Sequence, residues 1–239
     1  MLGTTAKAAE RAAELYRSFV RGGIFETDAT TAEAVKLMEN TFRDVNIALA
    51  NEMRSVCERI GADPEEAIRL ANRHPRVNIH QPGIGVGGHC IPVDPWFLVQ
   101  SAPDLAVLIR TAREINDRRP AAVADDLLGK LKASGARTVA LLGLAYKPDV
   151  DDFRESPAVS IANRVAEGFD GEVRIVEPFA SALPSPLDQR SNTRLMSLAD
   201  ALEGVDVVAC LVGHRAFAEP EARVACESRG AVDFAGLWT

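Results

Sequence analysis

The sequence has few of the residues that build metal centres, disulfide frameworks or membrane spans. Its cysteines number only four and form no C-x-x-C pair and no Cys/His cluster with zinc spacing: Cys57, Cys90, Cys210 and Cys226. No apolar run approaches the roughly 18 residues of a membrane span, and the chain starts with a polar, alanine-rich helix rather than a signal peptide. We therefore expect reduced thiols, no metal, no membrane partner and a location in the cytoplasm.

An excess of positive charge is also missing. Lysine and arginine together number 27 against 34 aspartate and glutamate residues, which gives a formal net charge of −7. This balance offers no electrostatic footprint for nucleic acid or for an anionic membrane. The composition is otherwise that of a globular protein, 47% hydrophobic and 26% charged. At roughly 150 residues per domain, the length suggests about one and a half to two domains.

The first half of the chain has helical periodicity. Apolar residues recur at helical spacing over residues 5–20, 31–60, 64–74 and 104–117. Thr30 or Thr31 can cap the second of these helices. A helix of about thirty residues is long for a globular domain, so we expect the 31–60 helix to serve as a spine or a homodimer surface. Pro120 fits a break or a restart before a further helical segment over residues 121–134, which Gly135 ends.

From residue 137 the pattern changes to alternating strands and helices. Residues 138–145 and 205–212 are near-continuous apolar runs, which are typical of strands buried on both faces of a parallel sheet. We predict an α/β protein with an all-helical dimerisation domain over residues 1–118 and a Rossmann-like parallel-sheet domain over residues 119–239. No G-x-G-x-x-G follows a strand with an acidic residue about twenty positions on, so the usual dinucleotide fingerprint is absent.

A glycine-rich loop carries the strongest chemical signal. Residues 85–94 read GVGGHCIPVD, within a proline- and glycine-rich stretch that has no sustained period. Glycines let the backbone approach a ligand closely, and Cys90 could attack an electrophile there. A cysteine is a nucleophile only as thiolate, which backbone N–H groups in such a turn could favour. Asp94 follows one turn later and could transfer a proton or position a water molecule. A buried structural cysteine is the alternative.

Lys36 and Asn40 stand one turn apart on the long predicted helix. An ammonium and an amide on one face could together stabilise an oxyanion. The alternative is a solvated lysine beside an ordinary helical asparagine.

Residues 145–157, AYKPDVDDFRESP, lie between a predicted strand and a predicted helix. Ligands bind to parallel sheets at this carboxyl edge, so Lys147 and Arg154 could hold phosphates by charge-assisted hydrogen bonds. Alternatively, both cations pair with the acidic residues of the same segment. The residues alone leave these alternatives open.

Together, residues 32–52, 73–97 and 142–157 resemble the UDP-glucose/GDP-mannose dehydrogenase family, and the resemblance extends from about residue 10 to the end. The segments ANRHPRVNIH and GVGGHCIPVDPWFLV are most similar to the branch of the family that acts on UDP-N-acetyl-D-mannosamine. The resemblance implies oxidation of a nucleotide-sugar C6 hydroxymethyl to a carboxylate with two NAD. UDP-glucose and UDP-N-acetylglucosamine are alternative substrates.

The resemblance also implies roles for individual residues. Cys90 matches the family nucleophile, which holds the aldehyde as a thiohemiacetal and then a thioester. Lys36 and Asn40 match the pair that polarises the reacting oxygen and water, and Asp94 matches the acid behind the cysteine. The matches to substrate-binding positions are Asn78, Gly85, Gly87, Gly88, Tyr146, Lys147 and Arg154, with Arg76 as the candidate for an arginine that reaches across the dimer.

The family's N-terminal NAD-binding domain has no counterpart in this sequence. On this resemblance, we expect the chain to be a truncated gene product, an engineered fragment or one half of a split enzyme. We expect little or no turnover from it unless other residues supply the NAD domain, which a separate polypeptide could carry. The alternative function is a non-catalytic dimeric module that binds a UDP-sugar. A third idea, NAD binding by the C-terminal domain itself, is disfavoured by the missing glycine fingerprint.

Overall fold

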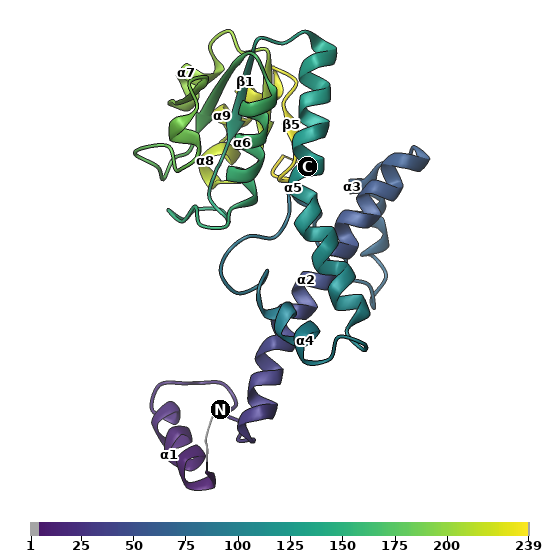
Figure 1. Ribbon diagram of the computed structural model, residues 1–239, viewed down its shortest axis with the longest axis vertical. Helices are drawn as coiled ribbons and strands as arrows, with labels where there is room; N and C mark the ends of the chain where they lie inside the picture. Colours follow the sequence, from purple (N-terminus) through teal and green to yellow (C-terminus); the bar gives the residue numbers. More distant parts are fainter. Residues whose placement is uncertain (1–4, 239) are drawn as a thin grey trace.

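The computed structural model describes residues 5–238, so residues 1–4 and 239 of the two predicted domains lie outside the described residues. The first half is helical, and a parallel α/β unit follows it (Figure 1). The helices of the first half are α1 (Ala6–Arg17), α2 (Ala29–Ile60), α3 (Pro64–Ala71), α4 (Asp94–Ser101) and α5 (Val107–Ser134). The helix α1 lies at the end of α2 that is farthest from the sheet (Figure 1).

Helix α2 forms the spine of the helical half. Asp28 caps it, because the carboxylate accepts hydrogen bonds from the Thr31 backbone N at 2.9 Å and from the Thr31 hydroxyl at 2.6 Å. The predicted cap at Thr30 or Thr31 is therefore wrong: a carboxylate just before the first turn is the stronger acceptor and also suits the helix dipole. The helix runs for 32 residues and ends at Gly61, whose φ of 77° favours glycine.

Helix α5 passes through Pro120 without interruption and runs for 28 residues. The predicted break is wrong. The proline removes one backbone hydrogen bond, but α5 packs against both α2 and α6, which keeps the helix continuous. The division of the chain at residues 118 and 119 stays a prediction, since this helix crosses it. Helix α4 was not predicted, because its short, largely apolar sequence shows little helical period.

The second half contains a five-stranded parallel sheet in the order β3-β2-β1-β4-β5. The strands are β1 (Thr138–Leu142), β2 (Glu172–Val176), β3 (Thr193–Leu195), β4 (Val207–Cys210) and β5 (Val232–Asp233). The connecting helices are α6 (Pro157–Gly168), α7 (Leu198–Leu202), α8 (Arg215–Ala218) and α9 (Pro220–Glu227), with a 3-10 turn at Leu187–Gln189. The predicted α/β class is confirmed.

Alternate residues of β1 enter two cores. Val139 and Leu141 pack with residues of α5 and α6, whereas Ala140 and Leu142 pack with Phe217 and its neighbours on the other face. The strand is thus buried on both sides, as its continuous apolar run predicts. Because the strand order reverses between β1 and β4, the segments that follow these strands meet at the carboxyl edge, where such sheets bind ligands.

Candidate active site

The cysteine loop, residues 83–91, is anchored where it leaves the helical half. Asn51 Oδ1 on α2 accepts a hydrogen bond from the Gly83 backbone N at 2.8 Å, and Arg119 Nε on α5 donates to the Gly83 carbonyl at 2.9 Å. At Gly85, where φ is 128°, a Cβ would lie 3.1 Å from the Pro120 ring. The loop therefore starts from a fixed point on two helices.

The glycines of this loop face protein atoms. A Cβ at Gly87 would lie 2.6 Å from Pro157 Cδ and 2.8 Å from the Glu155 carbonyl oxygen. At Gly88, with φ of 91°, it would lie 3.0 Å from the Tyr146 ring. Gly87 and Gly88 therefore let the cysteine loop pack closely against the segment that follows β1, in addition to any approach to a ligand.

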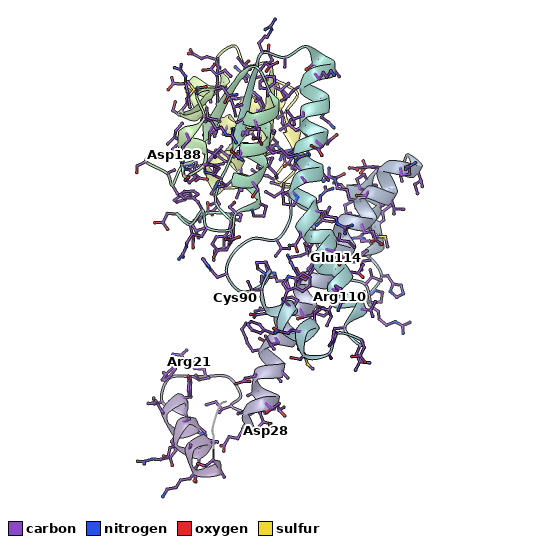
Figure 2. The ribbon with its side chains drawn as sticks, in the orientation of Figure 1. Arg21, Asp28, Cys90, Arg110, Glu114 and Asp188 are labelled. Atoms are coloured by element: carbon purple, nitrogen blue, oxygen red, sulfur yellow. The ribbon has the colours of Figure 1, made fainter. Side chains whose placement is uncertain are left out.

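Cys90 lies where the loop returns to the helical half, near α4 (Figure 2), and its residue is exposed. The backbone N of Asp94 donates to the Cys90 carbonyl at 2.8 Å, so Asp94 stands one turn after the cysteine and begins α4. The thiol is therefore accessible to a reactant, and the carboxylate that follows it belongs to a rigid element.

The predicted polar partners of Cys90 form a hydrogen-bonded chain. Lys36 Nζ donates to Asn40 Oδ1 at 3.3 Å, and Asn40 Nδ2 donates to Asp94 Oδ2 at 2.5 Å. The two partners fix the orientation of the asparagine amide, since ammonium can only donate and carboxylate can only accept. The structure thus brings together residues from α2 and α4 that are far apart in sequence.

A buried polar network lies behind this chain. Arg113 is ion-paired with both Asp44 and Asp117, and Asn116 Nδ2 donates to Asp44 Oδ1 at 2.9 Å. Burial raises the pKa of Asp44 even though the Arg113 guanidinium acts in the opposite direction. Asn51 Nδ2 contacts Asn116 Oδ1 at 3.4 Å, which connects the network to the anchor of the cysteine loop. The sequence analysis did not predict this network. Polar residues on the buried faces of α2 and α5 were the pattern that could have indicated it.

A cleft of about 370 Å³ lies between the two halves of the molecule. Its walls are Arg43 and Ile47 of α2, residues 85–91 including the reactive cysteine, and Tyr146 and Lys147 after β1. Arg43 was not predicted as a site residue, although it shares a helix face with the predicted oxyanion pair. The cleft therefore places a thiol, a tyrosine ring and basic groups around one space.

The two basic residues of the 145–157 segment differ in their surroundings. Lys147 is exposed at the cleft, with Nζ 5.4 Å from the centre of the Tyr146 ring. Arg154 instead forms a bidentate pair with Asp152, with N–O distances of 2.9 and 2.7 Å, and lines a second cleft at the start of α6. Hydrogen bonds from Arg154 hold the pKa of Asp152 well below its usual range. The ion-pair alternative thus describes Arg154 and not Lys147.

The structure does not bring Arg76 and Asn78 to the cleft. Both are exposed on the segment after α3, and the Arg76 backbone N donates to His74 Nδ1 at 3.3 Å. Within residues 5–238, no group of three or more His, Cys, Asp or Glu side chains could hold a metal ion, and no helix has both the length and the apolarity to cross a membrane.

Comparison with known proteins places the chain in a family. The profile of the UDP-glucose/GDP-mannose dehydrogenase family central domain matches residues 30–118, and the profile of its UDP binding domain matches residues 140–238. The chain belongs to this family, and the resemblance noted in the sequence is confirmed. The matched UDP binding region contains Tyr146 and Lys147.

Individual relatives agree with this placement. UDP-N-acetyl-D-mannosamine dehydrogenase of Campylobacter jejuni is 50% identical over 91% of this chain and 53% of that protein. NDP-N-acetyl-D-galactosaminuronic acid dehydrogenase of Ralstonia solanacearum is 46% identical over 99% of this chain and 55% of that protein. The structure of a UDP-D-ManNAc dehydrogenase from Pyrococcus horikoshii superimposes with a TM-score of 0.83 at 43% identity, covering 98% of this chain and 55% of that one. The chain spans about half the length of these relatives.

Proposed function

We propose that this chain supplies the catalytic cysteine and the nucleotide-sugar binding site of an NAD-dependent UDP-N-acetyl-D-mannosamine 6-dehydrogenase. The observation that carries the proposal is the hydrogen-bonded chain from Lys36 through Asn40 to Asp94, next to an exposed Cys90 in a cleft that also contains Lys147. The names of the Campylobacter and Pyrococcus relatives support the choice of sugar. The Ralstonia relative keeps an N-acetylgalactosamine-type sugar as the second candidate substrate.

The side chains divide the reaction between them. Cys90 Sγ adds to the C6 aldehyde carbon and gives a thiohemiacetal, whose oxygen carries the developing negative charge. Lys36 and the free N–H of Asn40 donate hydrogen bonds to this oxygen. Once the adduct has been oxidised to a thioester, a water attacks the carbonyl carbon and gives a proton to Asp94. The carbon–sulfur bond then breaks and releases the Cys90 thiolate and the carboxylic acid, which gives its remaining proton to solvent and becomes the carboxylate.

Residues 5–238 do not fit NAD. Gly143 lies in the first strand-to-helix turn, and protein atoms occupy the space beside it. A Cβ there would lie 2.6 Å from Val212 Cβ and 2.8 Å from the Val212 carbonyl oxygen. This turn also lacks the G-x-G-x-x-G fingerprint that brings backbone to a pyrophosphate. We therefore assign hydride removal to NAD held by residues other than those described, and expect little turnover from this chain alone.

The nucleotide is assigned to the C-terminal wall of the cleft. Tyr146 offers an aromatic face and Lys147 an ammonium without an acidic partner among the described ion pairs. Arg154 contributes only if a phosphate takes the place of Asp152, which makes it the weaker candidate. Backbone groups of Gly85, Gly87 and Gly88 line the sugar side of the same cleft.

We further propose a homodimer formed through α2. Exposed apolar side chains form a single stripe along this helix: Val35, Met38, Phe42, Leu49, Met53, Val56 and Ile60. They recur every three, four or seven residues, which is the pattern of a helix that packs along a partner helix. Phe42 and Ile60 are 65% and 72% exposed in the single chain. In such a dimer, Arg76 and Asn78 serve the partner's cleft. The free thiols of the described cysteines support a cytoplasmic location.

The test combines an NADH-formation assay with calorimetric titration of UDP on the same purified chain. The proposal predicts clear UDP binding, little turnover alone, and NADH formation from UDP-N-acetyl-D-mannosamine once the NAD-binding part of a relative is supplied. Replacing Cys90 by alanine must abolish that turnover and leave UDP binding intact. Activity that survives in Cys90→Ala refutes the covalent mechanism.

The same experiment separates the alternative function, a non-catalytic UDP-sugar-binding dimer. That module binds UDP and never forms NADH, whichever NAD-binding part is added. The packed Gly143 turn is compatible with both functions, because in neither do the described residues hold NAD. Turnover by the chain alone would instead show a cofactor site that the described residues do not reveal.

A further inference from the structure

A fully buried acid–imidazole pair lies outside the cleft and has no part in the chemistry above. Glu177, which directly follows β2, and His214, which follows β4, have side chains that are both 0% exposed, and His214 Nε2 lies 3.0 Å from Glu177 Oε2. Burying a charged carboxylate is costly unless it is fully hydrogen-bonded. The Glu177 carboxylate therefore needs further hydrogen-bond donors, and the groups that supply them are the groups that the pair holds in place.

Glu177 binds the backbone at the end of β1. Its Oε2 accepts hydrogen bonds from the backbone N of Leu144 at 2.6 Å and of Ala145 at 3.1 Å, the two residues that precede Tyr146. Its Oε1 accepts from the backbone N of Phe179 at 3.0 Å. One carboxylate thus accepts hydrogen bonds from backbone N–H groups that lie beyond the ends of β1 and β2, where the sheet no longer supplies partners.

His214 binds the backbone on the other side of Tyr146 and Lys147. Its Nδ1 accepts a hydrogen bond from the Asp149 backbone N at 3.0 Å. The ring proton is therefore on Nε2, from which it is donated to Glu177. Asp149 has a left-handed φ of 59°, an unfavourable conformation that this contact helps to hold.

Three further contacts hold these groups in place. The rings of Phe179 and Phe217 lie 5.2 and 5.5 Å from the His214 ring, centre to centre. Arg215 pairs with the Asp149 carboxylate at 2.6 Å. Residues 144–149 are therefore tethered at both ends, with the tyrosine and the lysine of the cleft between the tethers.

We propose that Glu177 and His214 are positioning residues that hold Tyr146 and Lys147 ready for the nucleotide of a nucleotide-sugar. The inference rests on the proposed function, because it concerns the same cleft. A tethered segment loses less conformational freedom on binding than a mobile one, so the tether raises affinity without touching the ligand.

The test is calorimetric titration of UDP into four single variants. In Glu177→Gln and His214→Gln we expect UDP affinity to fall about tenfold, the size expected from losing a hydrogen bond that orders the site. His214→Asn keeps an oxygen near the position of Nδ1 and is expected to retain most of the affinity. The matched control is Asp206→Asn at the opposite edge of the sheet, where a carboxylate accepts from the Arg137 and Thr138 backbone N atoms at 2.8 and 2.9 Å.

A double-mutant cycle supplies a readout that a purely structural role would not move. If His214 acts through Lys147, then His214→Gln costs less affinity in a Lys147→Ala background than in the wild-type chain. Full additivity, or unchanged affinity in both glutamine variants, overturns the inference. A wild-type chain that does not bind UDP overturns the proposed function itself, which is a distinct result.

Hydrogen exchange on the wild-type chain covers the case in which the variants do not fold. The amide of Asp149 is expected to exchange slowly, because it donates to a buried ring nitrogen. Exchange at the rate of an open loop overturns the proposed tether.

Discussion

Replacing Gly87 by alanine places a methyl group where protein atoms already lie. The new Cβ would be 2.6 Å from Pro157 Cδ, 2.8 Å from the Glu155 carbonyl oxygen and 3.1 Å from Tyr146 Cβ. None of these atoms is the end of a flexible side chain, so the cysteine loop must move away from the segment after β1. Overpacking of this kind costs about 1–3 kcal/mol.

Gly83→Ala is the matched control for this change. It adds the same methyl group to the same loop, but at a position where the Cβ has no atom within 4 Å. Its effect on the free energy of unfolding is expected to stay within about 0.5 kcal/mol. The two variants therefore differ in the contact with the C-terminal half and not in the chemistry of the substitution.

Urea unfolding and UDP calorimetry measure the outcome. For Gly87→Ala we expect a lower unfolding midpoint with an unchanged slope, together with weaker UDP binding because Tyr146 and its neighbour shift with the loop. Equal midpoints and equal UDP affinities for the two variants would refute the close packing on which the architecture of the cleft depends.

Three further predictions concern the catalytic chain, the buried acid and the dimer. Asn40→Ala is expected to lower kcat by about 10²–10³ in a preparation supplied with an NAD-binding part, as for loss of an oxyanion donor; an unchanged kcat would remove its role. Burial raises the pKa of Glu177, but hydrogen bonds from His214 and the backbone outweigh it and leave the pKa below the usual 4.5. Stability from this carboxylate is therefore present above about pH 4.5 and is lost as pH falls through the lower folded value, so the thermal midpoint falls in acid for wild type and less steeply for Glu177→Gln. Phe42→Asp is expected to yield monomers in sedimentation velocity, with Glu33→Lys outside the stripe as control; a dimeric Phe42→Asp would contradict the α2 interface.

Local sequence patterns predicted the elements whose residues carry their own signal. The apolar runs of β1 and β4 gave the parallel sheet, and the spacing along α2 gave the long helix. The helix-breaking propensity of Pro120 predicted an interruption that does not occur. Propensity acts locally, whereas packing of α5 against two neighbouring helices keeps it continuous.

Parts of the site depended on contacts that no local pattern contains. Cys90 and its polar partners were identifiable from residue types and family resemblance, but the bond between Asn40 and Asp94 joins positions that only the fold brings together. The packing of Gly87 against Pro157 and the Glu177–His214 pair are likewise contacts between distant segments. Each residue alone is an ordinary glycine, glutamate or histidine.

The most direct test of the central claim is alkylation of the chain with iodoacetamide, followed by mass spectrometry of each cysteine. Cys90 is exposed, whereas Cys210 and Cys226 are buried and their pKa values are raised by burial, so Cys90 is expected to react faster than either. Saturating UDP-N-acetyl-D-mannosamine is expected to protect Cys90 in the wild-type chain and to protect it less at the same concentration in Lys147→Ala. Labelling of Cys90 at the same rate with and without the UDP-sugar would contradict the claim that this cleft joins the nucleophile to the nucleotide-sugar.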